Sequence, residues 1–227
     1  MHLFGKYLTI YLYLFLMYGC QSKQAETKDV VESNSEVMDV NQENRMTILC
    51  FGNSLTAGYG LDDEATAWPN LLQERIDSLN LGYDVVNAGL SGETTSGGLN
   101  RIDWVLSQPI DVFILELGAN DMLRGLDVDQ TKKNLSMLLD KVQSKYPEAE
   151  IAIAGMLSPP NMGPAYESAF NDIFPALAET YDATLIPFFL EGVAGDPALN
   201  LPDGKHPNVA GQKIVLEKVW SILKDLI

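Results

Sequence analysis

The chain contains few of the residues from which metal and redox sites are built. Its 227 residues include two histidines and two cysteines. One of each, His2 and Cys20, lies in an N-terminal segment that we expect to direct export, which leaves His206 as the single histidine of the working domain. So sparse a set argues against a clustered His/Cys zinc site, an iron–sulfur cluster and a disulfide framework. We therefore expect neither a metal nor another cofactor.

Basic residues are also scarce. Lysine and arginine together number 15 against 31 aspartates and glutamates, which gives a net charge of −16 at pH 7. Nucleic-acid binding requires a basic face, so this charge argues against a nucleic-acid partner. The remaining composition is ordinary, with 46% hydrophobic residues and a mean hydropathy near zero. The length favours one folded domain, or two at most.

Residues 1–20 have the pattern of an export signal. Lys6 precedes an apolar run from Tyr7 to Tyr18, which is short for a membrane span and suits the core of a signal peptide. The run ends at Gly19 and Cys20, and it resembles a bacterial lipoprotein signal, in which the cysteine is lipidated after cleavage. We expect an exported, periplasmic or cell-surface protein held to a membrane through Cys20. An ordinary secretory peptide or an uncleaved anchor are the alternatives.

Residues 21–45 lack aromatic residues, glycine and proline and are rich in charged and amide side chains. They carry too little apolar surface to offset the entropy of ordering the chain. The sequence therefore predicts a disordered acidic tether over 21–45 and a folded domain over 46–227.

Short apolar runs alternate with helical periodicity through this domain. Strands are expected at 46–51, 83–86, 111–117, 151–156 and 184–187, and helices at 68–79, 94–106, 135–146, 166–181 and from Pro207 onward. Five such alternations predict a parallel sheet covered by helices on both faces. Functional residues should then lie in the loops that follow the carboxyl ends of the strands.

Four short segments occupy such positions: 52–55 (GNSL), 87–94 (NAGLSGET), 118–121 (GAND) and 203–207 (DGKHP). Together and in this order they resemble the motifs of the SGNH (GDSL-type) serine hydrolases, most closely the periplasmic multifunctional thioesterase/lysophospholipase and arylesterase branch. The resemblance covers about 46–226. It implies a three-layer α/β/α flavodoxin-like fold with a five-stranded parallel sheet, and a metal-independent esterase that forms an acyl-enzyme.

The chemistry of three residues agrees with that reading. A serine hydroxyl such as that of Ser54 becomes a good nucleophile only when an adjacent base takes its proton. His206 is the only histidine of the domain, and Asp203 lies close enough in sequence to hold its ring. Taken alone, Ser54 could equally be a turn residue that caps a helix. It is followed two positions later by Thr56, so the Gly-x-Ser-x-Gly elbow of the α/β-hydrolases, the alternative fold, is absent.

The resemblance further implies an oxyanion hole made by the backbone N–H groups of Ser54 and Gly92 and the side-chain amide of Asn120. Read singly, Gly92 could be a plain turn glycine and Asn120 a loop residue. One position departs from the family motif, because Asn53 stands where the motif has aspartate. That aspartate is outside the triad, so we expect a small change in local geometry and an active enzyme.

The expected substrate is a small-molecule or lipid ester. Residues 157–166 (LSPPNMGPAY) follow the fourth strand, and the prolines make this loop semi-rigid and apolar. We expect Pro160 and Met162 there, with Phe188 after the fifth strand, to contact an acyl chain. This favours lysophospholipid, short-to-medium acyl or aryl esters, and thioesters remain possible substrates. A carbohydrate O-acetylesterase, a transacylase and a non-catalytic lipid- or glycan-binding lipoprotein are the alternatives, and we expect a monomer.

Overall fold

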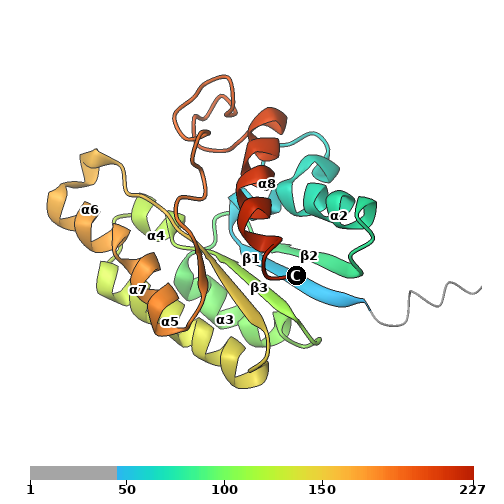
Figure 1. Cartoon of the computed structure of the whole chain (residues 1–227). Coiled ribbons are helices and arrows are strands. Elements are labelled where there is room, and N and C mark those ends of the chain that lie inside the picture. The colour runs from blue at the N-terminus through green and yellow to red at the C-terminus, as the bar shows by residue number, and fades with distance from the viewer. Residues whose placement is uncertain (1–44) are drawn as a thin grey trace, which may run out of the picture. The chain divides into compact units, whose positions relative to one another are not determined.

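The computed structural model describes residues 45–227, and Figure 1 shows their arrangement. The expected signal peptide, the lipidation of Cys20 and all but the last residue of the expected tether lie outside these described residues. Within 45–227, no helix is both long and apolar enough to cross a membrane.

Five parallel strands form one sheet, as the sequence predicts. They are β1 (Met46–Gly52), β2 (Tyr83–Gly89), β3 (Val112–Glu116), β4 (Glu150–Ala154) and β5 (Thr184–Ile186). Their order is β2-β1-β3-β4-β5, and every neighbouring pair is parallel. The inner strands β1, β3 and β4 are apolar runs because helices cover both of their faces, whereas the edge strand β2 is partly exposed.

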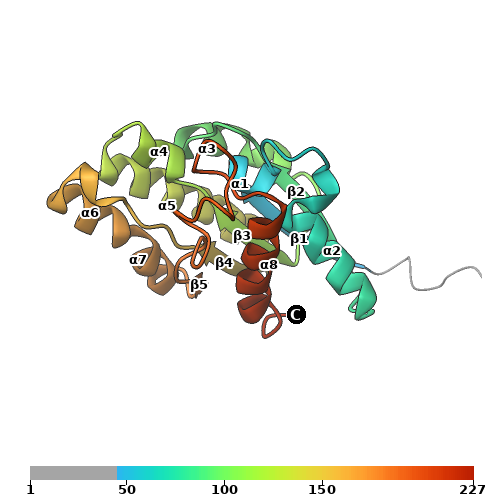
Figure 2. The ribbon, with the colours of Figure 1, turned by 90° about the horizontal axis from the view of Figure 1, so that it is seen from above.

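Within residues 45–227, eight helices and two short 3₁₀ turns surround the sheet. They are α1 (Ser54–Ala57), α2 (Trp68–Ser78), α3 (Thr95–Val105), α4 (Ala119–Leu123), α5 (Val128–Lys145), α6 (Pro164–Asn171), α7 (Ile173–Thr180) and α8 (Val209–Leu223), with η2 (Glu64–Thr66) and η3 (Pro160–Met162). Helices α2 and α8 cover one face of the sheet, and α3, α5, α6 and α7 cover the other (Figures 1 and 2). This is the three-layer α/β/α fold that the resemblance implies.

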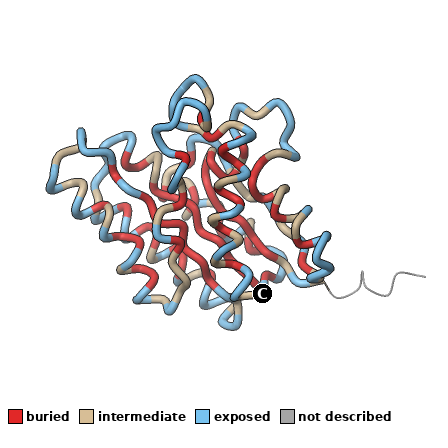
Figure 3. The backbone as a smooth tube through the Cα atoms, turned by 45° about the horizontal axis from the view of Figure 1, so that its top comes forward, coloured by how far each residue is buried: buried red, intermediate tan, exposed pale blue. Residues whose placement is uncertain are grey.

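The sheet separates two hydrophobic cores, and each strand contributes alternate residues to both. Along β1, Leu49 and Phe51 point to the α3 and α5 side, whereas Ile48 and Cys50 point to the α2 and α8 side. The buried segments follow the strands and the inner faces of the helices (Figure 3). Cys50 is fully buried, and desolvation raises the pKa of its thiol well above the usual range, so it is a packing residue without nucleophilic character.

Several helices differ from the expectation. The short helices α1 and α4 were not predicted, and α5 begins at Val128, before the expected range of 135–146. The helix expected over 166–181 is interrupted at Asp172, because the ring of Pro175 cannot accept the carbonyl of Asn171 that a continuous helix would place beside it. The last helix begins at Val209 and not at Pro207. Its N-cap is Asn208, whose side chain accepts hydrogen bonds from the N–H groups of the first turn.

Strand order reverses between β1 and β3, whose connections leave to opposite sides of the sheet. In open parallel sheets, ligands bind beyond the carboxyl ends of the strands at such a point. The segments that follow β1, β2 and β3 carry the first three sequence motifs, so the fold brings them to this edge of the sheet.

Candidate active site

Ser54 is the first residue of α1 and leaves the sheet directly after β1. The residue that caps this helix is Asn53, whose side-chain oxygen accepts the N–H of Leu55 at 3.0 Å. The capping role that the sequence left open for Ser54 therefore belongs to its neighbour, and the Ser54 hydroxyl lies 3.3 Å from the same Asn53 oxygen. The turn is tight, because a Cβ on Gly52 would lie only 2.2 Å from Thr56 Oγ1.

A chain of hydrogen bonds joins Ser54 to His206 and Asp203. The Ser54 Oγ lies 2.8 Å from His206 Nε2, and His206 Nδ1 lies 2.6 Å from Asp203 Oδ2. Ser54 and His206 are 152 positions apart in sequence, and the fold brings them within hydrogen-bonding distance. This is the order of contacts in which a carboxylate orients an imidazole and the imidazole can take a proton from a hydroxyl.

The Asp203 carboxylate is held ionised. Its burial alone would raise the pKa, but the hydrogen bonds from the His206 ring and from the backbone N–H groups of Lys205 and His206 outweigh that effect and lower the pKa to about 2. The two backbone bonds, 2.9 and 3.1 Å long, also fold the loop so that Asp203 faces the ring three residues later. A carboxylate fixed in this way stabilises the imidazolium that forms when His206 accepts a proton.

Tyr59 is a further contact of the histidine that the sequence did not indicate. Its ring centroid lies 4.7 Å from that of His206, with the planes inclined by 46°. Tyr59 is 52% exposed, so its ring covers one side of the imidazole at the mouth of the site. No periodicity or motif marks this residue, which follows α1 in an irregular turn.

The three expected oxyanion donors are on the segments that follow β1, β2 and β3. The N–H of Ser54 has no acceptor within its own helix because it is the first helical residue. Gly92 has φ of +81°, a conformation that suits glycine, in the exposed turn after β2. The Asn120 side chain donates from Nδ2 to the Glu93 carbonyl at 2.9 Å, which leaves its second amide hydrogen for a ligand.

A buried carboxylate connects the last two of these segments. Asp121 accepts hydrogen bonds from the N–H and the hydroxyl of Thr95, at 2.8 and 2.6 Å. Asn134 on α5 donates to the same hydroxyl at 3.0 Å. The sequence did not single out Asp121 or Thr95, and each follows within a few residues of a proposed oxyanion donor.

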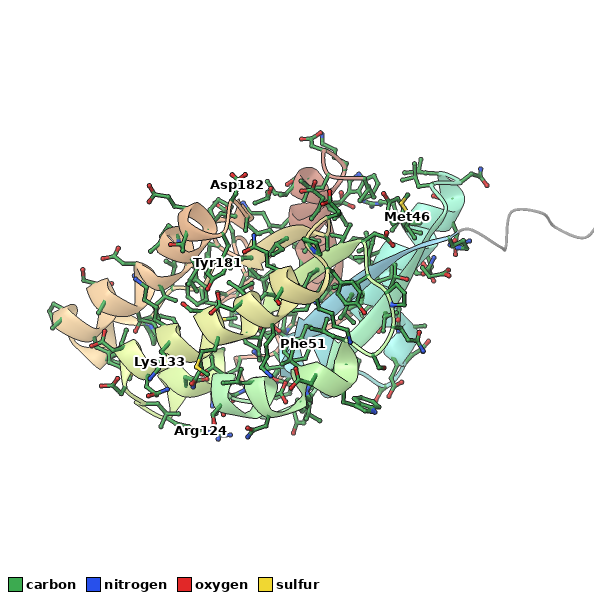
Figure 4. All side chains as sticks on the ribbon, turned by 90° about the horizontal axis from the view of Figure 1, so that it is seen from below. Met46, Phe51, Arg124, Lys133, Tyr181 and Asp182 are labelled. Atoms are coloured by element: carbon green, nitrogen blue, oxygen red, sulfur yellow. The ribbon has the colours of Figure 1, made fainter. Side chains whose placement is uncertain are left out.

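An ion pair fixes the turn after β2 from its other side. Glu93 is buried, and its carboxylate pairs with the Arg101 guanidinium on α3, which also donates to the Ala88 carbonyl at 2.8 Å. Arg124 donates to the Gly92 carbonyl at 2.8 Å, and its side chain is on the outside of the domain (Figure 4). The turn that carries Gly92 is therefore anchored on both flanks.

The residues expected to contact an acyl chain lie at the same edge of the sheet. Pro160 and Met162 form η3 after β4, and Phe188 follows β5. Pro160 is exposed and Met162 and Phe188 are half-buried, whereas the neighbouring Phe189 is buried in the core against Trp68. Their contact with substrate stays a prediction. Within 45–227 there is no group of three or more His, Cys, Asp or Glu side chains placed to hold a metal ion.

The chain is similar to known proteins over most of its length. The sequence model of the GDSL-like lipase/acylhydrolase family matches residues 50–214. Esterase TesA of Pseudomonas aeruginosa is 38% identical over 192 residues, which cover 84% of this chain and 94% of that protein. Thioesterase 1/protease 1/lysophospholipase L1 of Escherichia coli K12 is 38% identical over 182 residues, covering 80% of this chain and 85% of that protein.

This chain is also similar to a solved structure. The crystal structure of the psychrotrophic esterase EstA from a Pseudoalteromonas species, inhibited by monoethylphosphonate, superposes with a TM-score of 0.74 at 36% identity. The match covers 79% of this chain and 97% of that one. The fold, the family model and the esterase relatives thus indicate the same family and activity. The chain belongs to the GDSL-like lipase/acylhydrolase family and is a serine hydrolase that acts on ester bonds.

Proposed function

We propose that Ser54, His206 and Asp203 form the catalytic triad of this esterase. Ser54 Oγ attacks the carbonyl carbon of the ester while its proton passes to His206 Nε2. Asp203 keeps the imidazole in the tautomer that presents Nε2 as an acceptor and stabilises the resulting imidazolium. The negative charge that develops on the carbonyl oxygen is held by the N–H groups of Ser54 and Gly92 and by the Asn120 amide.

Collapse of the tetrahedral intermediate completes the first half of the reaction. The bond to the leaving group breaks, His206 gives its proton to the departing alcohol or thiol, and the acyl group stays on Ser54 Oγ. Water then attacks the acyl-enzyme with His206 again as the base, and the carboxylic acid is released. No step requires a metal or a cofactor.

The observation that carries this proposal is the continuous hydrogen-bond chain from Ser54 through His206 to Asp203. It is tested with a fluorophosphonate, which reacts with an activated serine. We expect covalent labelling of the wild-type protein at Ser54 and no labelling of Ser54→Ala. Persistent labelling of the Ser54→Ala variant, or none of the wild type, would show that Ser54 is not the nucleophile.

The proposed substrates are lysophospholipids and short-to-medium acyl or aryl esters, with thioesters as a related class. What supports them is the apolar character of the half-buried Met162 and Phe188 at the edge of the sheet where Ser54 lies. The test is a series of p-nitrophenyl esters of increasing chain length beside an acetylated xylan and a lysophosphatidylcholine. Maximal kcat/KM on acetyl groups of the polysaccharide would instead identify a carbohydrate acetylesterase, and acyl transfer to added alcohols in preference to water would identify a transacylase.

The protein is further proposed to be exported and attached to a membrane by a lipid on Cys20, and to act as a monomer. The support is the N-terminal sequence, in which a short apolar run ends at Gly19-Cys20. Cell fractionation of the full chain and of Cys20→Ala, with metabolic labelling by a radioactive fatty acid, tests it. We expect labelled wild-type protein in the membrane fraction and unlabelled Cys20→Ala; labelling that survives the substitution rules out this anchor.

A further inference from the structure

A buried carboxylate lies directly beneath the turn that carries Ser54. Glu116, the last residue of β3, has no exposed surface. Its Oε1 accepts the side-chain amide of Asn53 at 2.7 Å, and its Oε2 accepts the Asn53 N–H at 3.1 Å and the Thr56 hydroxyl at 2.8 Å. Three hydrogen bonds therefore hold this carboxylate to Asn53 and Thr56, the residues that flank Ser54 and Leu55.

Asn53 connects Glu116 to Ser54. Its amide nitrogen binds Glu116, while its oxygen accepts the N–H of Leu55 at 3.0 Å and lies 3.3 Å from Ser54 Oγ. The side chain is 1% exposed and is thus fixed at both ends. A shift of Asn53 would displace the start of α1 and the hydroxyl that must meet His206.

We propose that Glu116 is a positioning residue of this esterase, which holds the nucleophile turn as an ionised carboxylate through Asn53 and Thr56. The inference rests on the proposed role of Ser54 and goes beyond it, because within residues 45–227 the Glu116 side chain hydrogen-bonds to Asn53 and Thr56 and to none of the triad residues or oxyanion donors. The family motif has aspartate at position 53, whereas this chain has asparagine. The asparagine suits an ionised Glu116 because its side-chain amide donates a hydrogen bond to the carboxylate.

The hydrogen-bond donors show why the ionised form fits. Both groups of Asn53 that meet Glu116 are N–H donors and cannot accept, so each carboxylate oxygen must act as an acceptor. Burial opposes the charge and raises the pKa of Glu116 to about 7, although the bonds from Thr56 and Asn53 pull it down. The group therefore loses its proton near neutral pH, inside the folded protein.

The charged groups around Glu116 are few. It meets Gly52 at the end of β1, Asn53 at the N-cap of α1 and Thr56 within α1, all uncharged. Cys50 is the titratable side chain on the same face of β1, and burial keeps it protonated. His206 is linked to Glu116 only through Ser54 and Asn53. The ionisation of Glu116 is thus governed by burial and by its three donors.

An aspartate at position 53 would change the chemistry of this contact. It would face Glu116 with a second carboxyl group at hydrogen-bonding distance, and two such groups cannot both ionise in a buried site. One proton would be retained between them. Asn53 supplies the same bond without a retained proton, so the carboxylate and the amide form a complementary pair.

The experiment exchanges the carboxylate of Glu116 and the side-chain amide of Asn53. In Glu116→Gln, an amide replaces a carboxylate opposite the two N–H donors of Asn53, and one donor loses its acceptor. We expect kcat to fall about 10-fold to 100-fold with little change in KM, because the nucleophile is displaced from its reactive position. The double variant Asn53→Asp/Glu116→Gln restores a carboxylate–amide pair in the reverse order, and we expect it to recover most of the lost kcat.

Stability against pH gives a readout that does not depend on activity. Asn53→Asp keeps a proton in the folded state that the unfolded chain releases, so its Tm should fall more steeply than that of the wild type between pH 7 and 9. Asn80→Asp and Glu217→Gln, both at exposed positions, carry the same chemical changes and should match the wild type in kcat and KM.

The outcomes separate this inference from the proposed function. If the wild type hydrolyses esters and labels at Ser54 while Glu116→Gln keeps its kcat, or if the double variant is no better than Glu116→Gln, Glu116 is not a positioning residue. If Glu116→Gln does not fold, the Tm profile of Asn53→Asp decides, and a profile parallel to the wild type overturns the proposal. An inactive, unlabelled wild type would refute the triad instead.

Discussion

The Asp121 carboxylate accepts both the N–H and the hydroxyl of Thr95, at 2.8 and 2.6 Å. Asp121 follows Asn120 in α4, and Thr95 begins α3 just after the turn of Gly92. Two loops that each supply a proposed oxyanion donor are thus fixed to one another below the site. Because a donor must lie about 3 Å from the developing oxyanion to be effective, this contact sets the distance between two of the three donors.

Asp121→Asn should therefore lower kcat without loss of the triad. The amide can satisfy only one of the two Thr95 donors, and a buried unsatisfied group costs roughly 1–3 kcal/mol of stability. We expect a lower Tm and a kcat reduced ~10-fold, less than the ~10²–10³-fold loss typical for removal of an oxyanion donor, as in Asn120→Ala. Steady-state kinetics on one ester and thermal unfolding of both variants check this order. A larger loss in Asp121→Asn than in Asn120→Ala would contradict it.

Gly92→Ala separates backbone geometry from side-chain volume. A Cβ at Gly92 would meet nothing closer than Arg124 Nη2 at 3.9 Å, but φ of +81° is strained for alanine. We expect a destabilisation of about 1–2 kcal/mol and a drop in kcat as the N–H rotates away from the oxyanion.

Gly82→Ala is the matched control for that variant. Its φ is +70° and its Cβ would also meet open space, but Gly82 precedes β2, at the opposite end of the strand from the site. It should show the same loss of stability with unchanged kcat. Equal kcat in the two variants would mean that the Gly92 N–H takes no part in the reaction.

The pKa of Asp203 predicts how the protein responds to acid. A carboxyl group with a pKa lowered to about 2 stabilises the fold above its unfolded pKa of about 4, and that contribution disappears as pH falls from about 4 through 2. Asp203→Asn should thus have a lower Tm than the wild type at pH 6, and the difference should vanish near pH 2. Calorimetry over this range checks it; a difference that is constant with pH would contradict an ionised Asp203.

Asp203→Asn should also be nearly inactive at every pH. Without the carboxylate the imidazole is free to adopt the tautomer that cannot accept the Ser54 proton, and we expect kcat to fall by about 10³–10⁴. Steady-state kinetics of Asp203→Asn and the wild type on one ester between pH 5 and 9, where Asp203 is ionised in the wild type, check this expectation. A kcat of Asp203→Asn within tenfold of the wild type at any pH in this range would contradict the proposed role of Asp203.

Tyr59→Ala tests the ring that lies on His206. Removal of the ring exposes one side of the imidazole to water, and we expect a severalfold lower kcat/KM with an unchanged Tm, because Tyr59 is mostly exposed. Tyr59→Phe keeps the ring and should behave as the wild type. If the Phe variant is as impaired as the Ala variant, the hydroxyl and not the ring is the important group.

The sequence predicted the sheet, which the structure confirms, and proposed the triad, both for identifiable reasons. The strands are continuous apolar runs because both faces are buried, and the scarcity of histidine left His206 as the only base. Pairs such as Asp121 with Thr95 and Glu116 with Asn53 join positions 26 and 63 residues apart, and nothing local in the sequence distinguishes these acids from solvated ones. The sequence predicted one helix over 166–181, but Pro175 divides it into α6 and α7.

The three residues of the proposed triad lie in segments of different kinds. Ser54 begins a helix directly after a central strand, whereas Asp203 and His206 lie in the stretch between β5 and α8, which consists of turns and one isolated bridge. The side chains of Asn200 and Asn208 hold that stretch through a few bonds to its own carbonyls. Segments of this kind open at lower free energy than the strands they join. Mild denaturant should thus separate His206 from Ser54 and abolish esterase activity while both hydrophobic cores are still intact.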